Sequence, residues 1–342
     1  MLDLDPRKHE ILDAIIEAYI HDAEPVGSER LAQRLRLRAS PATIRNEMAA
    51  LEVMGYLSHP HTSAGRVPTD RGYRFYVDFL QQDEPLSPQE RQRVRRMLRP
   101  GEERARLPEE VARALAAITE YASVVTSPGA ESQVFKHLHL IPLTTRQVLA
   151  VIVTDAGIFH GKTFTAHDPL EPEGLDRLSR VVSQRLQGYA LVEITGDLLA
   201  RFVHEAAWQH RIVEELTSWL QDRLPMLADR RVHIEGTANI LRQPEFQDAR
   251  SAQPVLSALE REEVLNDLLR AAEGRDVWVT IGREHRHEGL RGTSVIAAPY
   301  RLAGHPGGAL GIVGPTRMKY AKVIALVRYL AGNLTELLGE PS

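Results

Sequence analysis

The sequence has 342 residues, of which 43% are hydrophobic and 26% charged, a balance typical of a folded chain with two or three domains. Its formal net charge of -4 excludes a histone-like coat on nucleic acid, although a local basic patch stays possible. The absence of cysteine excludes disulfide scaffolds, thiolate metal sites and cysteine nucleophiles. Residues 1–10 lack an apolar signal core, and no apolar run is long enough to cross a bilayer. We therefore expect a cytoplasmic protein without a membrane partner.

The N-terminal part of the chain has the pattern of three short helices. Apolar residues at helical spacing predict the first helix over residues 6–21, and Pro25-Val26-Gly27 interrupts it. Ser28 is expected to cap a short second helix. Ser40-Pro41 then opens a third helix, which stops at Gly55. Three helices with joints this short predict a helix-turn-helix.

The third predicted helix has two different faces. Ile44, Met48 and Leu51 share one side at about 100° per residue and are expected to face the core. Arginine and asparagine on the other side can form paired hydrogen bonds to base edges, and small residues there let a helix enter the major groove. The residues of this second face and its flanks are Ala42, Thr43, Arg45, Asn46 and Ala49.

A short hairpin is expected after this helix. Residues 56–57 and 67–68 predict two short strands around a polar, glycine-containing tip, which is the pattern of a wing. Thr69-Asp70 is expected to cap a following helix whose aromatic residues belong to the core. Residues 30–74 hold eight arginines against three acidic residues, a net charge of +5, whereas residues 1–29 are acidic. The basic charge therefore lies where contacts with DNA phosphates would need it.

The rest of the chain predicts an antiparallel α+β domain. Residues 81–107 are expected to form a linker that contains an arginine-rich polar helix, and an amphipathic helix is predicted from Glu109 to Val125. Three strands, helices and three further strands follow, before a long closing helix from Arg317 to Leu338. The predicted strands are 135–143, 148–154, 158–165, 277–281, 293–300 and 309–313, with a short one at 232–235; the intervening helices are 172–187, 197–224 and 255–272.

Several runs along the chain closely resemble the heat-inducible transcription repressor family, HrcA. In the N-terminal part these are Glu24-Pro25-Val26-Gly27-Ser28, Ser40-Pro41-Ala42-Thr43-Ile44-Arg45-Asn46-Glu47-Met48, Gly55-Tyr56-Leu57 and residues 61–69. In the C-terminal part they are residues 236–241, Pro244-Glu245-Phe246, Ile281-Gly282-Arg283-Glu284 and residues 311–318. The resemblance spans about residues 6 to 335. Two residues depart from the family pattern: His285 stands where asparagine is usual, and Lys319 at a position that is often acidic or polar.

The resemblance implies a winged-helix DNA-binding domain (1–80), a linker (81–107), a GAF-like domain (108–167 and 256–342) and a dimerising domain inserted in it (168–255). It implies a homodimer that binds the inverted-repeat operator CIRCE upstream of chaperonin and DnaK-type operons, represses them, and is inactivated on heat stress. Chaperonin of the GroEL type is the implied modulator. The expected DNA-contacting residues are Ser40, Ala42, Thr43, Arg45 and Asn46 in the third helix, and His61, Thr62, Ser63 and Arg66 in the wing.

The sequence also allows two other functions to be compared with a repressor. One alternative is a ligand-gated regulator with a metabolite pocket in the GAF-like domain, although no convergent set of polar residues names a ligand. The other is an enzyme with a DNA-binding head. The sequence lacks a nucleophile elbow and a phosphate-binding loop, and the zinc-protease pattern fails after His204, so no catalytic residues are predicted. Histidine pairs such as His137/His139 lack further ligands, so neither a metal nor a cofactor is expected.

Overall fold

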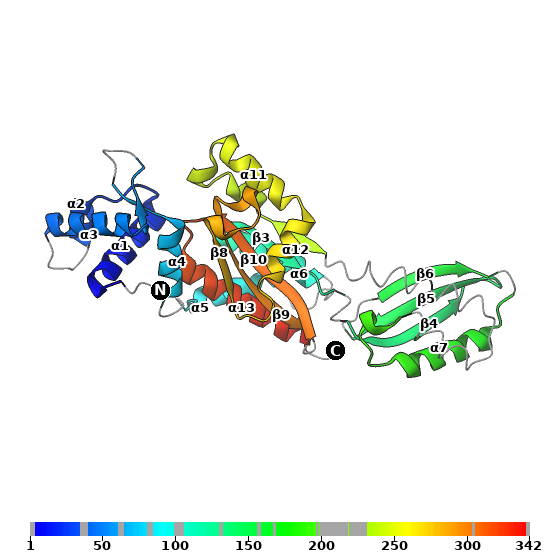
Figure 1. The fold of residues 1–342 in the computed structure, drawn as a ribbon. Coiled ribbons are helices and arrows are strands. Elements are labelled where there is room, and N and C mark those ends of the chain that lie inside the picture. Colours follow the sequence, from blue (N-terminus) through cyan, green and yellow to red (C-terminus); the bar gives the residue numbers. More distant parts are fainter. Residues whose placement is uncertain are drawn as a thin grey trace.

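A computed structural model describes residues 4–34, 40–60, 65–80, 85–98, 106–129, 133–155, 159–166, 169–195, 198, 218, 231–302 and 305–339. These residues form an N-terminal helical body, a central sheet covered by helices on both faces, and a smaller sheet with one packed helix (Figure 1). The N-terminal body and the smaller sheet lie at opposite ends of the central sheet and its helices (Figure 1). Among the described residues, no helix has the length and apolar character needed to cross a membrane.

The N-terminal body is a winged helix, as the sequence predicts. Thr69 caps α4 through its side chain, which accepts a hydrogen bond from the Gly72 amide at 3.2 Å. The buried apolar stripes of α1 and α3 pack together with Leu31 of α2. The elements are α1 (Pro6–Asp22), α2 (Ser28–Arg34), α3 (Pro41–Val53), β1 (Leu57–Ser58), β2 (Val67–Pro68) and α4 (Asp70–Asp78).

The polar helix expected in the linker is α5 (Pro88–Met97), and it packs against the central body. Ser87 and Glu90 form a capping box at its start. Val94 is fully buried, and Lys322 of the C-terminal helix forms an ion pair with Glu90 at 2.5 Å. The hydrogen bond that Lys322 donates within this ion pair lowers the pKa of the Glu90 carboxyl to about 2. The segment therefore contains a docked helix as well as connecting chain.

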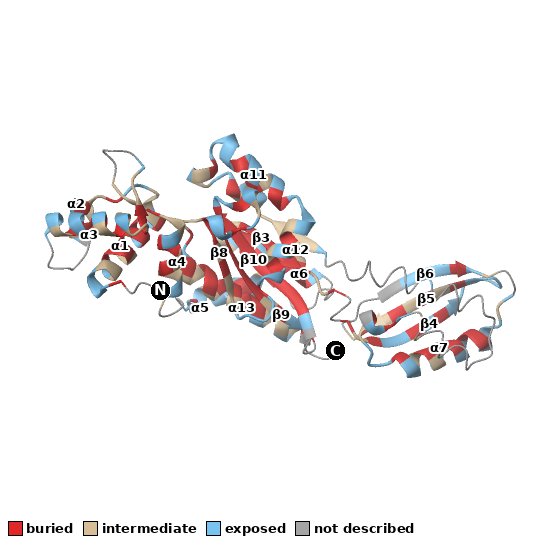
Figure 2. Ribbon diagram, viewed as in Figure 1, coloured by how far each residue is buried: buried red, intermediate tan, exposed pale blue. Residues whose placement is uncertain are grey.

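Five described strands form the central antiparallel sheet in the order β7-β3-β10-β9-β8. Side chains of β9 alternate: Ile296 and Ala298 face α6 and α13, whereas Val295 and Ala297 face α11 and α12. Because helices cover both faces, the inner strands β3, β10 and β9 are mostly buried, as the colours in Figure 2 show, whereas the edge strands β7 and β8 are only partly buried. The strands are β3 (Ala122–Thr126), β7 (Val232–Glu235), β8 (Trp278–Ile281), β9 (Thr293–Leu302) and β10 (His305–Pro315). The helices are α6 (Leu107–Thr119), α10 (Thr237–Ile240), α11 (Ala249–Leu259), α12 (Glu262–Arg270) and α13 (Tyr320–Gly339), with 3-10 turns η4 (Pro244–Phe246), η5 (Gly282–Glu284) and η6 (Glu288–Leu290).

A second antiparallel sheet has its own hydrophobic core. Its strands pair in the order β4-β5-β6, and α7 packs on β4. Ser183 and Ser179 of α7 accept hydrogen bonds from the Leu138 and Leu140 amides at 2.9 and 3.0 Å, so α7 covers the open edge of β4. The elements are β4 (Phe135–Pro142), β5 (Gln147–Thr154), β6 (Phe159–Thr165), α7 (Pro172–Leu186) and η3 (Leu191–Glu193).

The predicted boundaries of the insert were wrong. Strands 135–165 were assigned to the GAF-like domain, but they form the separate second sheet. Residues 232–255 were assigned to the inserted domain, but β7 pairs with β3 in the central sheet and the start of α11 packs on it. The inserted body therefore begins before Phe135 and ends before Val232. The predicted helix 197–224, apart from the helical residues Leu198 and Ser218, and the tip of the hairpin after Asp155 lie outside the described residues.

Two predicted helices also need correction. The helix predicted over 109–125 ends at Thr119, because Glu120 takes a left-handed conformation (φ 58°) and the β-branched run after it becomes β3. The helix predicted over 255–272 is two helices, α11 and α12, separated near Arg261.

Candidate nucleic-acid interface

The recognition-helix candidate, α3, is held by its buried side and leaves the other side free. Ser40 caps it by accepting the Thr43 amide at 3.2 Å, with Pro41 as its first residue. Ile44, Met48 and Leu51 are buried against α1 and α2. On the opposite side Ala42, Arg45, Asn46 and Ala49 are exposed, and Thr43 is half-buried with its hydroxyl 3.0 Å from that of Ser40.

Arg45 and Asn46 have the two side chains best suited to read bases. Neither has an ion-pair or hydrogen-bond partner within the part of the chain that the structure describes. Arg45 also lines a hollow of about 330 Å³ between α3 and the base of the wing, together with His59 and Arg66. The guanidinium of Arg45 is therefore available for a guanine edge or a phosphate.

The base of the wing is fixed to the turn between α1 and α2. Val26 and Arg66 exchange two backbone hydrogen bonds of 2.9 Å, and β1 and β2 pair directly beyond them. Gly65 is required here, since a Cβ atom at this position would lie 2.4 Å from the Val26 carbonyl. The wing therefore leaves the body at a defined point beside α3.

Arg66 is not free in this structure. Its Nε atom lies 2.9 Å from a carboxylate oxygen of Glu52, at the end of α3, and only a fifth of its side chain is exposed. Contact with DNA would require Arg66 to exchange this carboxylate for a phosphate. The other predicted wing contacts, His61, Thr62 and Ser63, lie outside the described residues.

Val53 was missed by the sequence analysis. It is 89% exposed, the most exposed large hydrophobic side chain among the described residues. It follows Asn46 by seven residues, so it lies on nearly the same face of α3 two turns later. The helical spacing that selected Ala42, Asn46 and Ala49 continues to Val53, and this signal could have identified it.

The winged helix is mounted on the central body through α4. Arg74 donates to both carboxylate oxygens of Glu284, from Nε at 2.7 Å and from Nη2 at 2.5 Å, and also to the Val279 carbonyl at 2.7 Å. Burial opposes the ionisation of Glu284, but the hydrogen bonds from Arg74 and the Ile281 amide outweigh it, so the pKa of Glu284 is lowered. Asp70 accepts the Arg283 amide at 2.9 Å. We call these contacts of Asp70 and Arg74 with η5 and β8 the α4 clamp.

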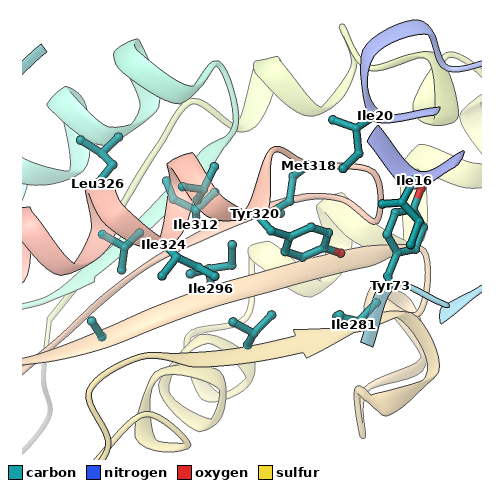
Figure 3. Packing of buried hydrophobic residues seen from close by; sticks show 14 of the residues in the cluster. Ile16, Ile20, Tyr73, Ile281, Ile296, Ile312, Met318, Tyr320, Ile324 and Leu326 are labelled. Atoms are coloured by element: carbon teal, nitrogen blue, oxygen red, sulfur yellow. The ribbon is translucent and has the colours of Figure 1, made fainter. Parts of the chain in front are cut away.

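An apolar contact continues the α4 clamp into the core. The rings of Tyr73 on α4 and Tyr320 on α13 lie 5.9 Å apart, and both are almost fully buried. Figure 3 shows Tyr320 beside Tyr73 and Ile16, with Ile281 and Met318 nearby. One buried cluster therefore runs from the winged helix into one face of the central sheet. The orientation of α3 relative to the central body is fixed by these contacts.

Within the described residues, no group of three or more histidine, aspartate or glutamate side chains could hold a metal ion. His137 and His139 do lie near each other on β4, with ring centroids 6.1 Å apart.

Comparison with known proteins identifies both parts of the chain. Residues 3–79 match the model of the "winged helix-turn-helix transcription repressor, HrcA DNA-binding" family, and residues 106–324 match that of the "HrcA protein C terminal domain". A heat-inducible transcription repressor HrcA of Pelotomaculum thermopropionicum is 38% identical over 98% of this chain and 97% of its own length. One of Moorella thermoacetica is 38% identical over 98% of each chain. A crystal structure of a hypothetical protein has the same fold, with a TM-score of 0.67 and 23% identity over 99% of this chain and 100% of that chain.

Proposed function

Because the chain belongs to the HrcA family of heat-inducible transcription repressors, we propose that it represses chaperonin and DnaK-type operons by binding the CIRCE inverted repeat as a homodimer. Membership in this family makes it a DNA-binding negative regulator of heat-shock genes and not an enzyme. The observation that carries the operator proposal is the exposed face of α3, where Arg45 and Asn46 have no partner among the described residues and lie between small residues. The site of action would be the cytoplasm.

In the proposed complex α3 lies in the major groove. Arg45, Asn46 and Thr43 contact base edges, because arginine and asparagine form paired hydrogen bonds to guanine and adenine. Ser40 and Ala42, at the start of α3, lie at the edge of the groove. Arg66, with His61, Thr62 and Ser63 of the wing, contacts the adjacent backbone or minor groove. Ala49 and Val53 would then lie along the same groove and favour thymine methyl groups.

A homodimer is proposed because an inverted repeat needs two recognition helices related by two-fold symmetry. The inserted body is the proposed dimerising part. It carries three of the exposed large hydrophobic side chains of the described chain, Ile141, Leu143 and Tyr189, at 46%, 51% and 37% exposure. Ile141 and Leu143 are two residues apart, at and just beyond the end of β4, and apolar side chains exposed close together favour contact with a partner. We also propose that the central body is a GAF-like domain.

Regulation by chaperonin is also proposed. On heating, misfolded proteins would occupy chaperonin. The repressor would then lose access to the chaperonin that keeps it in its active fold. This requires an active fold that is easily lost, in line with the marginal stability of most domains. Chaperonin added after a heat pulse should raise the fraction of operator-competent repressor, and an unchanged fraction would contradict this regulation.

Substitution of Arg45 tests the mode of operator reading. Arg45→Ala should lose about 1–3 kcal/mol of binding free energy on a CIRCE repeat and much less on random DNA. Arg7→Ala is the control, since Arg7 is exposed on α1, outside the α3 face. Equal losses on both duplexes would make Arg45 a phosphate contact and not a base contact.

A further inference from the structure

A groove of about 590 Å³ lies beside the open edge of the central sheet, a volume suited to a small molecule. One wall is formed by α12 and the other by β8 and the loop that follows it. Val264, Leu268 and Trp278 supply apolar surface. The groove is thus separate from the α3 face and from the inserted body.

Two imidazoles in this groove have buried ring nitrogens without a well-formed hydrogen bond. His285 has a relative exposure of 3%, and although its ring lies against the backbone of Thr293, neither ring nitrogen makes a hydrogen bond of good geometry within the described residues. The Nδ1 atom of His287, which also lines the groove, is buried and unpartnered in the same way. Burial lowers the pKa of His285 to about 4, so the ring is neutral at physiological pH. Buried polar groups in folded proteins almost always have a partner, and a ligand in the groove would supply one.

The charge of the groove favours an anion. Its lining includes Arg270 and Arg286, for which no described partner exists, against Asp267 and Glu284. Glu284 is already neutralised by the two hydrogen bonds from Arg74. Among the described residues of the lining, two arginine side chains and one carboxylate therefore lack a partner, and they lie beside a wall of apolar side chains.

The groove directly adjoins the mounting of the DNA-binding domain. Glu284 lines the groove and also receives Arg74 of the α4 clamp, and His285 is the next residue. Gly282 and Arg283, on the same 3-10 turn, contact Asp70 of α4. A ligand that moves this turn would change how the winged helix is held.

We propose that this groove binds a small organic carboxylate with an apolar body, and that the bound molecule changes operator affinity through the α4 clamp. The carboxylate pairs with Arg286 or Arg270, the imidazoles of His285 and His287 hydrogen-bond the ligand, and its body lies on Trp278 and Leu268. The proposal that the groove binds a carboxylate is independent of the proposed repressor function. The proposed effect of the ligand on operator affinity rests on that function.

Binding is tested on the full chain with benzoate and octanoate as probes, and with benzamide and octanamide as neutral controls. At saturation a carboxylate probe should raise the Tm by about 5 °C or more, because it stabilises only the folded state. Arg286→Ala and His285→Phe should each abolish the shift, whereas Arg261→Ala, on the end of α12 and outside the groove, should keep it. Absence of a shift with both carboxylates, an equal shift with the amides, or a shift that persists in Arg286→Ala would overturn the site.

Coupling is tested by titrating a CIRCE duplex with and without the carboxylate. The ligand should change the Kd for DNA by about fivefold or more. Asp70→Ala should still show the Tm shift but lose the effect on DNA, since Asp70 does not line the groove and its loss removes the acceptor of the Arg283 amide. An unchanged Kd in the wild-type chain that shows the Tm shift would refute the coupling. If the ligand-free chain shows no preference for the CIRCE duplex at all, that result would count against the proposed repressor function and not against the coupling.

Discussion

Gly282 is the position where the α4 clamp is most sensitive to a single methyl group. Its φ is +53°, and a Cβ atom there would lie 2.2 Å from the Asp70 carboxyl carbon. Gly282→Ala therefore incurs left-handed backbone strain of about 1–2 kcal/mol. It also forces Asp70 away from the Arg283 amide, which costs a further charged hydrogen bond of about 1.5–3 kcal/mol. We expect the free energy of unfolding to fall by about 2.5–5 kcal/mol.

Gly274→Ala is the matched control for this measurement. Gly274 also has a positive φ, +73°, but no atom lies within 4 Å of the added Cβ. It should lose only the strain, so the difference between the two variants in urea denaturation isolates the contact with Asp70. In an Asp70→Ala background, Gly282→Ala should cost no more than Gly274→Ala. Equal losses for the two glycine variants in the wild-type background would refute the reasoning about the clamp.

Two further predictions concern α3 and α1. If Val53 contacts a thymine methyl group, replacing one operator thymine by deoxyuridine should weaken wild-type binding by about 1 kcal/mol and leave Val53→Ala unaffected; equal losses in both proteins would exclude that contact. Burial raises the pKa of Asp13 from 3.8 to about 6, so the folded chain keeps a proton that the unfolded chain has released. Stability should therefore decline as the pH rises from about 4 to 6, and Asp13→Asn should remove the decline. Urea midpoints across this range check it, and parallel curves for the two proteins would contradict it.

The winged helix could be predicted well because its signals are local. The Ser40-Pro41 cap, the buried spacing of α3 and the strands of the wing are set by neighbours in sequence, and each is present in the structure. The free state of Arg45 and the pairing of Arg66 with Glu52 could not be read from the sequence, since both depend on how side chains meet in space. Val53 could have been found from spacing alone.

The organisation of the C-terminal part could not be predicted in the same way. The residues of β3 pair with partners more than 100 positions away, on β7 and β10, and no local pattern reveals that pairing. The α4 clamp joins Asp70 to Arg283 across 213 positions and Arg74 to Glu284 across 210. Such contacts follow from sheet order and domain docking, which is why the boundaries of the insert were misplaced although most strands were found.

The central claim is that the chain recognises an inverted repeat and not DNA in general. The most direct test titrates salt while comparing a CIRCE-type repeat with a scrambled duplex of equal composition. We predict a preference for the repeat of about 1,000-fold or more, one dimer per site and a steep fall in affinity with salt. Equal, weak binding of both duplexes by the 342-residue chain, with chaperonin present as well as absent, would contradict the claim.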